Sequence, residues 1–501
     1  MAEDLRAKAV GGMKWVLLTT YVGQAVGAAS NYALAWVLEP RDWALVGAAM
    51  VVITIVRSCG NFGVNYALVH WRGDIAEAAA TGHTLMWGVS LAAFGLVLAV
   101  APLTAAYFRT PGMPLVTAIL ALSLLLKPPS VVAEGTLRKD FRLARLFVIE
   151  VGSHLVSSAL ALVIAVLLPR GSRYWALVVG GLAWEGLRAG LSFWLTNVPL
   201  RLGFDRQVAR DLLRYGKFLV GSSILIVLYL SVDRLVLGRV DMTALGLYVF
   251  ASTWVSQLGL VPAQIFSGVA LPLYARLQDD PERVRSAYCR VLSYTALVAL
   301  PLLAGLMMVV PDAVRLALPA AYHDSIQTFQ ILCLYTIVRA LDNPSGQLFT
   351  AIGKPRYDTA LNAANLAALV PLMVWLAPAY GAAGAALALL FARALRLALT
   401  MAFCSRVLTC PLGRLADALM PATSAAAVMS GALWGAEALV PFAGGGLGWL
   451  RLGGLVALGG VVYVGVVYLS HRELFVEVLR LVRDAVVPGK KSDGREQAAA
   501  S

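Results

Sequence analysis

The chain consists of long apolar stretches separated by short polar connections. A helix needs about 20 apolar residues to cross the roughly 30 Å of hydrocarbon in a bilayer. Fourteen stretches meet that length, at residues 15–38, 43–67, 82–107, 114–135, 146–168, 174–198, 217–238, 244–270, 290–310, 326–350, 358–378, 383–404, 417–438 and 449–469. The pattern therefore predicts an all-α polytopic membrane protein with about fourteen transmembrane helices.

The composition agrees with this pattern. Of the 501 residues, 59% are hydrophobic and only 14% are charged, whereas a soluble protein carries about a quarter charged residues. This composition argues against a soluble multidomain enzyme and against a disordered chain. The net charge of +13 fits loops held at an anionic membrane leaflet better than it fits binding to nucleic acid.

Basic residues alternate between the connections. With the N-terminus inside, the inner loops and ends hold roughly 27 of the 41 Lys and Arg residues, and the outer loops hold about 7. Loops rich in Lys and Arg remain in the cytoplasm, so both termini are predicted to be cytoplasmic.

The two halves of the chain are weakly similar, at an offset of about two hundred residues. We predict two six-helix lobes related by pseudo-two-fold symmetry, a linker between them and two further helices. The predicted domains are a lobe at 1–200, an amphipathic linker at 201–216, a lobe at 217–410, two additional transmembrane helices at 411–470, and an amphipathic helix with a disordered tail at 471–501. Parallel repeats of this kind enclose a cavity in alternating-access transporters.

Ionisable residues inside the predicted spans are the candidate functional groups, because charge in hydrocarbon is costly and normally faces a cavity or a partner. The cations are Arg57, Lys127, Arg188, Arg234, Arg339, Arg393 and Arg396, and the anions are Glu185, Asp233 and Asp342. Five of the cations, Arg57, Lys127, Arg188, Arg339 and Arg396, lie about 20 Å from the outer ends of their helices, in the inner half of the bilayer.

A structural interpretation competes with a functional one. Glu185 with Arg188, and Arg339 with Asp342, are spaced i, i+3 and can neutralise each other on one helix face. Long side chains can also extend to the membrane interface, and this would account for Arg57 and Lys127. Asp233 beside Arg234 fits a structural or gating pair better than an ion-coupling site.

No motif indicates a bound cofactor. The five cysteines, Cys59, Cys289, Cys333, Cys404 and Cys410, have no pairing pattern, and no Cys/His spacing resembles a metal site. The glycine runs lack the Gly-Lys-Thr context of a phosphate loop. We expect neither a metal nor a cofactor.

Several short stretches together resemble the Wzx-type polysaccharide flippases. They are Leu38–Trp43, Gly60–Val69, Leu137–Arg142, Tyr174–Val178, Asp233–Gly238, Leu245–Tyr248 and Gly353–Arg356. Their order and spacing, over about residues 10–410, are similar to the branch of colanic-acid and teichuronic-acid exporters in the multidrug/oligosaccharidyl-lipid/polysaccharide exporter superfamily. Two residues depart from the family pattern, because glycine is usual where Ala44 and Arg173 stand.

The resemblance implies a transporter rather than an enzyme. It implies a multi-pass protein of the bacterial inner membrane that moves an undecaprenyl-pyrophosphate-linked oligosaccharide from the cytoplasmic to the outer leaflet. Its implied partners are that substrate, membrane lipids, a polysaccharide polymerase and chain-length proteins, with no nucleic acid. On this reading, the cations expected to bind the headgroup are Arg57, Lys127, Arg188, Arg339, Arg393 and Arg396.

The remaining polar residues have less specific roles. Asp233, Arg234, Asp342 and Glu185 are candidates for ion coupling or gating. Asn31, Gln257, Asn362 and Asn365 are candidates for contacts with sugar hydroxyls, although bonding between helices is the favoured explanation. Two other functional classes stay open, namely a polytopic enzyme of envelope glycan assembly, such as a polymerase or ligase, and a small-molecule exporter of the same superfamily. The short outer loops and the net positive charge within the spans argue against both.

Overall fold

A computed structural model describes residues 2–59, 75–140, 142–196, 203–210, 227–259, 270–407, 411–442 and 444–472. These residues are almost entirely helical, and they include no β-strand. Six of the described helices are long and apolar enough to cross a membrane. The predicted class, an all-helical multi-pass membrane protein, is confirmed, whereas the number fourteen stays a prediction.

The helices follow the apolar stretches along the chain. An N-terminal group comprises α1 (Ala2–Ala35), α2 (Pro40–Cys59), α4 (Ile75–Phe108), α5 (Met113–Lys139), α6 (Leu143–Phe147), the π-helix η1 (Val148–Gly152), α7 (Ser153–Leu167) and α8 (Tyr174–Leu195). A C-terminal group comprises α10 (Val232–Val240), α11 (Met242–Gly259), α13 (Pro281–Ala317), the 3-10 helix η2 (Ala320–Ser325), α14 (Ile326–Ala351), α15 (Pro355–Val407), α16 (Leu412–Leu439) and α17 (Gly445–Ser470).

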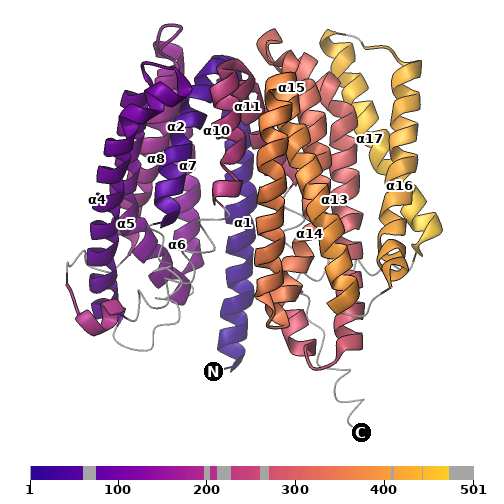
Figure 1. The fold of residues 1–501 in the computed structure, drawn as a ribbon, viewed down its shortest axis with the longest axis horizontal. Coiled ribbons are helices and arrows are strands. Elements are labelled where there is room, and N and C mark those ends of the chain that lie inside the picture. Colours follow the sequence, from indigo (N-terminus) through magenta and orange to yellow (C-terminus); the bar gives the residue numbers. More distant parts are fainter. Residues whose placement is uncertain are drawn as a thin grey trace.

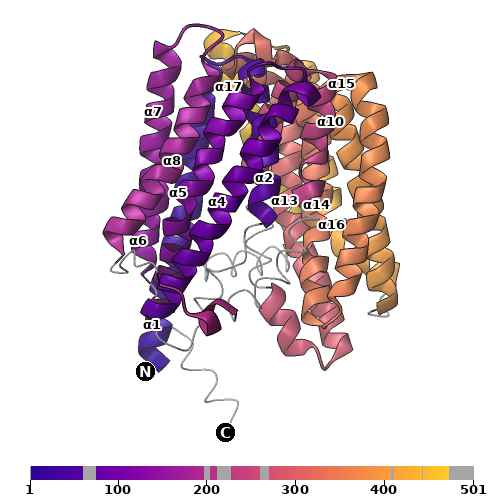
Figure 2. The same cartoon turned by 60° about the vertical axis from the view of Figure 1, so that its left-hand side comes forward.

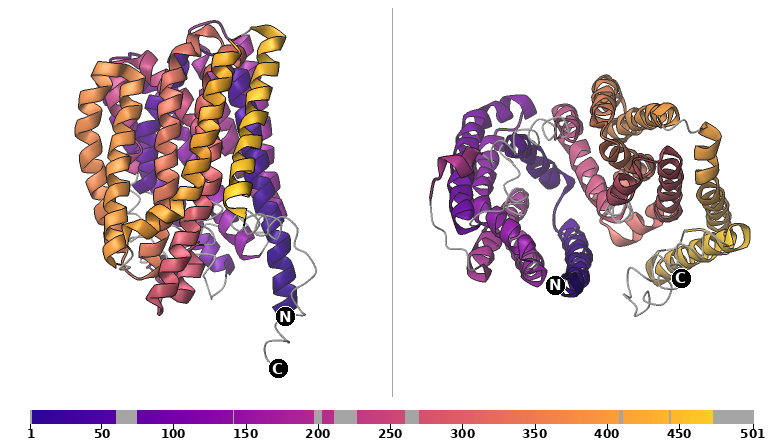
Figure 3. Two further views of the ribbon diagram at one scale, coloured as in Figure 1. Left: turned by 90° about the vertical axis from the view of Figure 1, so that its right-hand side faces the viewer. Right: turned by 90° about the horizontal axis from the view of Figure 1, so that it is seen from below.

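The two groups lie side by side with their long helices running in the same general direction (Figures 1 and 2). Seen from below, the N-terminal group occupies one side of the molecule and α13–α17 the other (Figure 3). Helices α16 and α17 pack on α13 at the edge farthest from the N-terminal group (Figure 1). The start of α1 lies at the lower end in Figure 1, and the α1–α2 connection lies at the opposite end, called the upper end here.

The outer surface of the bundle is apolar. Leu167, Trp194, Leu439 and Leu469 each expose 76% or more of their surface, although they are large hydrophobic residues. In water such a surface would drive association, whereas in a bilayer it faces lipid tails. The exposed leucines are thus consistent with a membrane-embedded bundle.

The upper end is closed by contacts between α2 and α11. The Trp43 ring packs on Phe250 with a centroid distance of 5.7 Å, and Phe250 lies 4.5 Å from the Tyr322 ring of η2. The Trp43 Nε1–H group donates a hydrogen bond of 3.0 Å to Tyr322 Oη, which donates one of 2.7 Å to the Leu38 carbonyl. These residues are buried, so the two helix groups share one core at this end.

Arg173 also ties the upper end together. Its Nη1 donates a hydrogen bond of 2.8 Å to the Val37 carbonyl in the turn between α1 and α2. An unpaired carbonyl at a helix end needs such a donor. The arginine that departs from the family pattern therefore caps a neighbouring helix.

Helix α15 changes direction at Gly381. This residue has φ 57° and ψ −132°, a conformation that side chains other than glycine rarely adopt. The two segments, 355–380 and 382–407, correspond to the predicted spans 358–378 and 383–404, which the structure joins into one broken helix.

Some predictions concern residues outside the described part. These are the motif at 60–69, most of the amphipathic linker 201–216, the first half of the span 217–238, the end of the span 244–270, and the tail beyond residue 472. Within the linker, residues 206–210 are helical. Among the described residues, Cys289, Cys333 and Cys404 belong to no disulfide.

The closest backbone approach at the upper end involves Gly246. A Cβ atom placed on this residue would lie 1.8 Å from the carbonyl oxygen of Pro40. We expect Gly246→Ala to lower the Tm of the purified protein in detergent, because the backbones of α2 and α11 must separate. Gly95→Ala in α4 is the matched control, since nothing lies within 4 Å of that position and alanine improves helix propensity by about 1 kcal/mol. Equal Tm values for the two variants would contradict this close packing.

Candidate functional site

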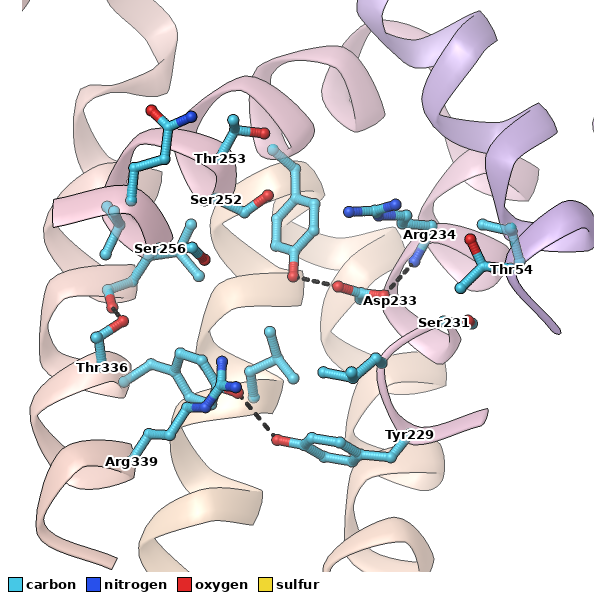
Figure 4. Close-up of a pocket in the computed structure, with 18 residues that line it drawn as sticks. Thr54, Tyr229, Ser231, Asp233, Arg234, Ser252, Thr253, Ser256, Thr336 and Arg339 are labelled. Carbon is cyan, nitrogen blue, oxygen red and sulfur yellow. Dashed lines mark hydrogen bonds between the residues drawn. The ribbon is translucent and has the colours of Figure 1, made fainter. Parts of the chain in front are cut away.

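A polar cavity of about 430 Å³ lies among α2, α10, α11, α14 and α15. Figure 4 shows its lining, with Ser252, Thr253 and Ser256 of α11 on one wall and Arg339 of α14 below them. Helix α2 provides the lining residues of the N-terminal group, Val51 and Thr54. Ligand sites in proteins enclose about 300–1,000 Å³, so the cavity has the size of a binding site.

The hydroxyl groups of the lining are oriented by the helix backbones. Ser252 and Thr253 donate to the Val249 carbonyl at 3.0 and 2.7 Å, and Thr336 donates to the Leu332 carbonyl at 2.8 Å. A hydroxyl has one hydrogen to donate and two lone pairs. Because each hydrogen is already used, these residues offer acceptors to a ligand.

Charge in the cavity comes from one buried acid and two arginines. The Asp233 carboxylate accepts hydrogen bonds from the Tyr248 hydroxyl and from the backbone N–H of Arg234. The Arg234 and Arg339 guanidinium groups form no ion pair with any described residue, and Arg234 Nε is buried without an acceptor. The i, i+3 pairing of Arg339 with Asp342 was wrong, because Asp342 is held by other arginines.

In the N-terminal group, the predicted cations meet two acids. Arg57 Nη1 lies 3.4 Å from Glu185 Oε1. Arg188 lies 3.6 Å from Glu185, as the i, i+3 spacing predicted, and 2.5 Å from Glu150 of the π-helix. The Arg188 guanidinium also lies over the Trp184 ring, 4.8 Å from its centroid. Arg188 is thereby neutralised and held between helices.

Lys127 has no ion-pair partner among the described residues. It lies on α5 and lines a small pocket of about 20 Å³ together with Arg57, whose side chain is 37% exposed. Thr54 of the large cavity precedes Arg57 by one turn on the same face of α2, about 4.5 Å along the axis. Arg57 therefore lies one turn of α2 from the large cavity, and Lys127 shares the small pocket with Arg57.

In the C-terminal group, Asp342 is the centre of a buried network. Its carboxylate pairs with Arg393 at 2.9 Å and with Arg396, and it accepts a hydrogen bond of 3.0 Å from Thr400. Arg396 also pairs with Asp358 at 2.7 Å. The positive charges of two arginines and the negative charges of two acids cancel in this network, which joins α14 to both segments of α15.

The same ion pair occurs in each group. Arg188–Glu150 and Arg396–Asp358 each join residues 38 positions apart, and one constant offset relates the members of the first pair to those of the second. Glu150 lies in η1 and Arg188 in α8, whereas Asp358 and Arg396 lie in the first and second segments of α15. This repetition is an internal similarity that the weak sequence match between the halves did not reveal.

The four glycan-contact candidates are in different surroundings. Gln257 lines the cavity. Asn362 donates to Asp358 at 3.0 Å, and Asn365 is 2% exposed with its Oδ1 unbonded. Asn31 is half-buried on α1, outside the cavity lining.

Several residues of the site lie outside the set that the sequence predicts. Tyr229 and Tyr335 both line the cavity, and their hydroxyl groups form a hydrogen bond of 3.1 Å. Glu150 and Asp358 complete the repeated ion pairs. The shared 38-residue spacing is a signal that could have identified these two acids, whereas the tyrosines have no comparable pattern.

A second cavity, of about 570 Å³, is apolar. It lies among α13, α16 and α17 and is lined by residues such as Leu302, Val309, Leu455 and Val464. No cluster of His, Cys, Asp or Glu suited to a metal ion occurs in the described ranges.

The fold is that of known membrane transporters. The structure is similar to that of the lipid II flippase MurJ in an inward closed conformation, with a TM-score of 0.70, 13% identity, and coverage of 91% of this chain and 98% of that one. It is also similar to an inward-facing multidrug resistance MATE family transporter, with a TM-score of 0.56, 15% identity, and coverage of 75% and 95%. The chain thus shares the fold of these two transporters.

The sequence comparisons specify the family. The model of the polysaccharide biosynthesis protein family matches residues 33–327, and the chain belongs to this family. It is 24% identical over 401 residues to the lipopolysaccharide biosynthesis protein WzxC of Escherichia coli, covering 77% of this chain and 79% of that protein. It is 25% identical over 303 residues to the teichuronic acid biosynthesis protein TuaB of Bacillus subtilis, covering 59% and 61%. The resemblance to Wzx-type flippases and the assignment as a transporter rather than an enzyme are confirmed.

The buried network around Asp342 gives a stability prediction. We expect Asp342→Asn to lower the free energy of unfolding by about 3–5 kcal/mol, because two buried arginines lose their shared counter-charge. Asp358→Asn is the matched control: its side chain is 32% exposed, against 0% for Asp342, and Arg396 keeps its bond to Asp342. The measurement is equilibrium unfolding in mixed micelles. An equal loss in both variants would show that Asp342 is not the centre of the network.

Proposed function

We propose that this protein is a flippase for an undecaprenyl-pyrophosphate-linked oligosaccharide, which it moves from the cytoplasmic to the outer leaflet of the bacterial inner membrane for surface polysaccharide synthesis. The observation that carries the proposal is a polar cavity with unpaired cations inside a helix bundle of transporter fold. The names of its relatives, which concern lipopolysaccharide and teichuronic acid biosynthesis, support the same cargo.

The proposed architecture consists of fourteen spans, with lobes at 1–200 and 217–410, two further helices at 411–470 and both termini in the cytoplasm. The ion pair repeated with one spacing in both helix groups supports two related lobes. In this topology the upper end of the molecule faces outward, so its closed Trp43–Tyr322 contact is the outer gate of an inward-directed state.

For the diphosphate we propose Lys127 and Arg57 as the first contacts. Lys127 is unpaired among the described residues, and the Arg57 pair is long and partly exposed. Glu185 is buried and also pairs with Arg188, so a diphosphate can replace it as the partner of Arg57 without leaving Glu185 unpaired. Arg188, Arg393 and Arg396 are engaged in shorter pairs, and we assign them to holding the helices together.

Two further parts complete the proposed mechanism. Asp233 is our candidate for ion coupling or gating, since it is the carboxylate that faces the cavity, whereas Glu185 and Asp342 are held by arginines. The apolar cavity among α13, α16 and α17 would accommodate part of the prenyl chain.

A small-molecule exporter is the second candidate function, favoured by the MATE-like fold.

The headgroup proposal is tested by neutralising its cations. We expect the double variant Arg57→Gln/Lys127→Gln to lose export of the polysaccharide, with the lipid-linked oligosaccharide retained on the cytoplasmic side. The control is Arg138→Gln on the same helix as Lys127, because Arg138 is 54% exposed and pairs at the surface with Glu134. The measurement is surface polysaccharide and leaflet-resolved lipid-linked oligosaccharide in a deletion strain carrying each variant. Normal export by the double variant would refute the assignment.

Alternating access is tested by locking the upper end. A Cβ on Gly47 would lie 3.7 Å from Val249 Cβ, within the usual range for a disulfide. We expect oxidised Gly47→Cys/Val249→Cys to stop export, and reduction to restore it. Each single cysteine variant is the control. Export by the fully cross-linked protein would show that α2 and α11 need not separate.

A further inference from the structure

We propose that the polar cavity selects oligosaccharides that contain an acidic sugar, whose carboxylate binds between Arg339 and Arg234. This inference rests on the proposed flippase function and specifies its cargo. It arises from the two cavity arginines that remain without an ion-pair partner among the described residues.

The lining is suited to a sugar. Ser252, Thr253 and Thr336 have already donated their hydrogens to backbone carbonyls and present acceptors. Sugar hydroxyls can donate to these oxygens, and the side-chain amide of Gln257 adds a donor and an acceptor. A sugar ring with its hydroxyl groups is therefore complementary to the cavity lining, whereas an apolar ligand would leave the acceptors of the lining unpaired.

The two cavity arginines, Arg234 and Arg339, also favour an anionic ligand. Every other arginine discussed within the spans has a carboxylate partner, but Arg234 and Arg339 face the cavity without one in the described structure. An unpaired guanidinium at membrane depth is costly. A neutral sugar would displace water and leave Arg339 without a counter-charge, whereas a carboxylate would accept two parallel hydrogen bonds from one guanidinium.

The local charge favours a carboxylate over the diphosphate at this position. Asp233 lies on the same cavity wall and is 8% exposed, so it repels an added anion. Together with Arg234 and Arg339 it leaves a net charge of +1 at this position, which a single carboxylate neutralises and a diphosphate would exceed. The diphosphate has its own cations, namely Arg57, one turn along α2 from the cavity lining, and Lys127, which shares a pocket with Arg57. One extended ligand can thus place its diphosphate there and its acidic sugar beside Arg339.

The test uses two matched ligands and the full-length protein in detergent. Each ligand is a short prenyl diphosphate linked to a disaccharide, which ends in glucuronic acid in one ligand and in glucose in the other. We expect isothermal titration calorimetry to give a Kd about tenfold lower for the glucuronic acid ligand, as one charge-assisted contact provides. This comparison needs no variant, so it does not depend on the folding of a mutant.

Variants then locate the selectivity. Arg339→Gln should bring the ratio of the two Kd values close to one, and Arg339→Lys should retain part of it. Arg57→Gln is the control, and it should weaken both ligands by a similar factor and preserve the ratio. Equal affinities of the unaltered protein for the two ligands, or a ratio that Arg339→Gln does not change, would overturn this inference and leave the flippase proposal intact. Absence of binding to both ligands would instead overturn the flippase proposal, and this inference with it.

Discussion

The structure depends on how charge is accommodated at membrane depth. A buried charge is tolerated when a counter-charge and hydrogen bonds replace its lost water. Asp342 meets this requirement with two arginines and Thr400, and Arg188 meets it with Glu150 and Glu185. These pairs join different helices, so the same contacts that neutralise charge also fix how the helices pack.

Because most charges cancel, the remaining ones define the site. Positive charge without a described counter-charge is left at Lys127 on α5 and at Arg234 and Arg339 in the cavity. Helix α2 lies between these positions, with Thr54 facing the cavity and Arg57 one turn beyond it. An unpaired cation at such depth is costly, and this cost supports the proposal that its counter-ion arrives with the substrate. The distribution of charge thus connects the packing of the bundle with its proposed cargo.

The sequence predicted the helices and the ionisable positions well, because hydropathy and the cost of buried charge are local properties. It did not predict which residues form ion pairs and hydrogen bonds with one another. Asp342 pairs with Arg393 and Arg396, about fifty residues away, rather than with Arg339 one turn earlier. Tyr229 meets Tyr335 only after the chain folds. Such long-range pairs depend on how α10, α14 and α15 pack, which a single sequence does not encode as a readable pattern.

The placement of α16 and α17 has a mechanical consequence. They contact α13, with a smaller contact from α16 to α15, and they lie at the edge away from the N-terminal group. In the proposed alternating-access cycle, this pair would move with the C-terminal group. The apolar pocket between α13, α16 and α17 would then keep its shape. A prenyl chain bound there would stay anchored to the C-terminal group, while the polar headgroup of the same lipid moves between the two helix groups.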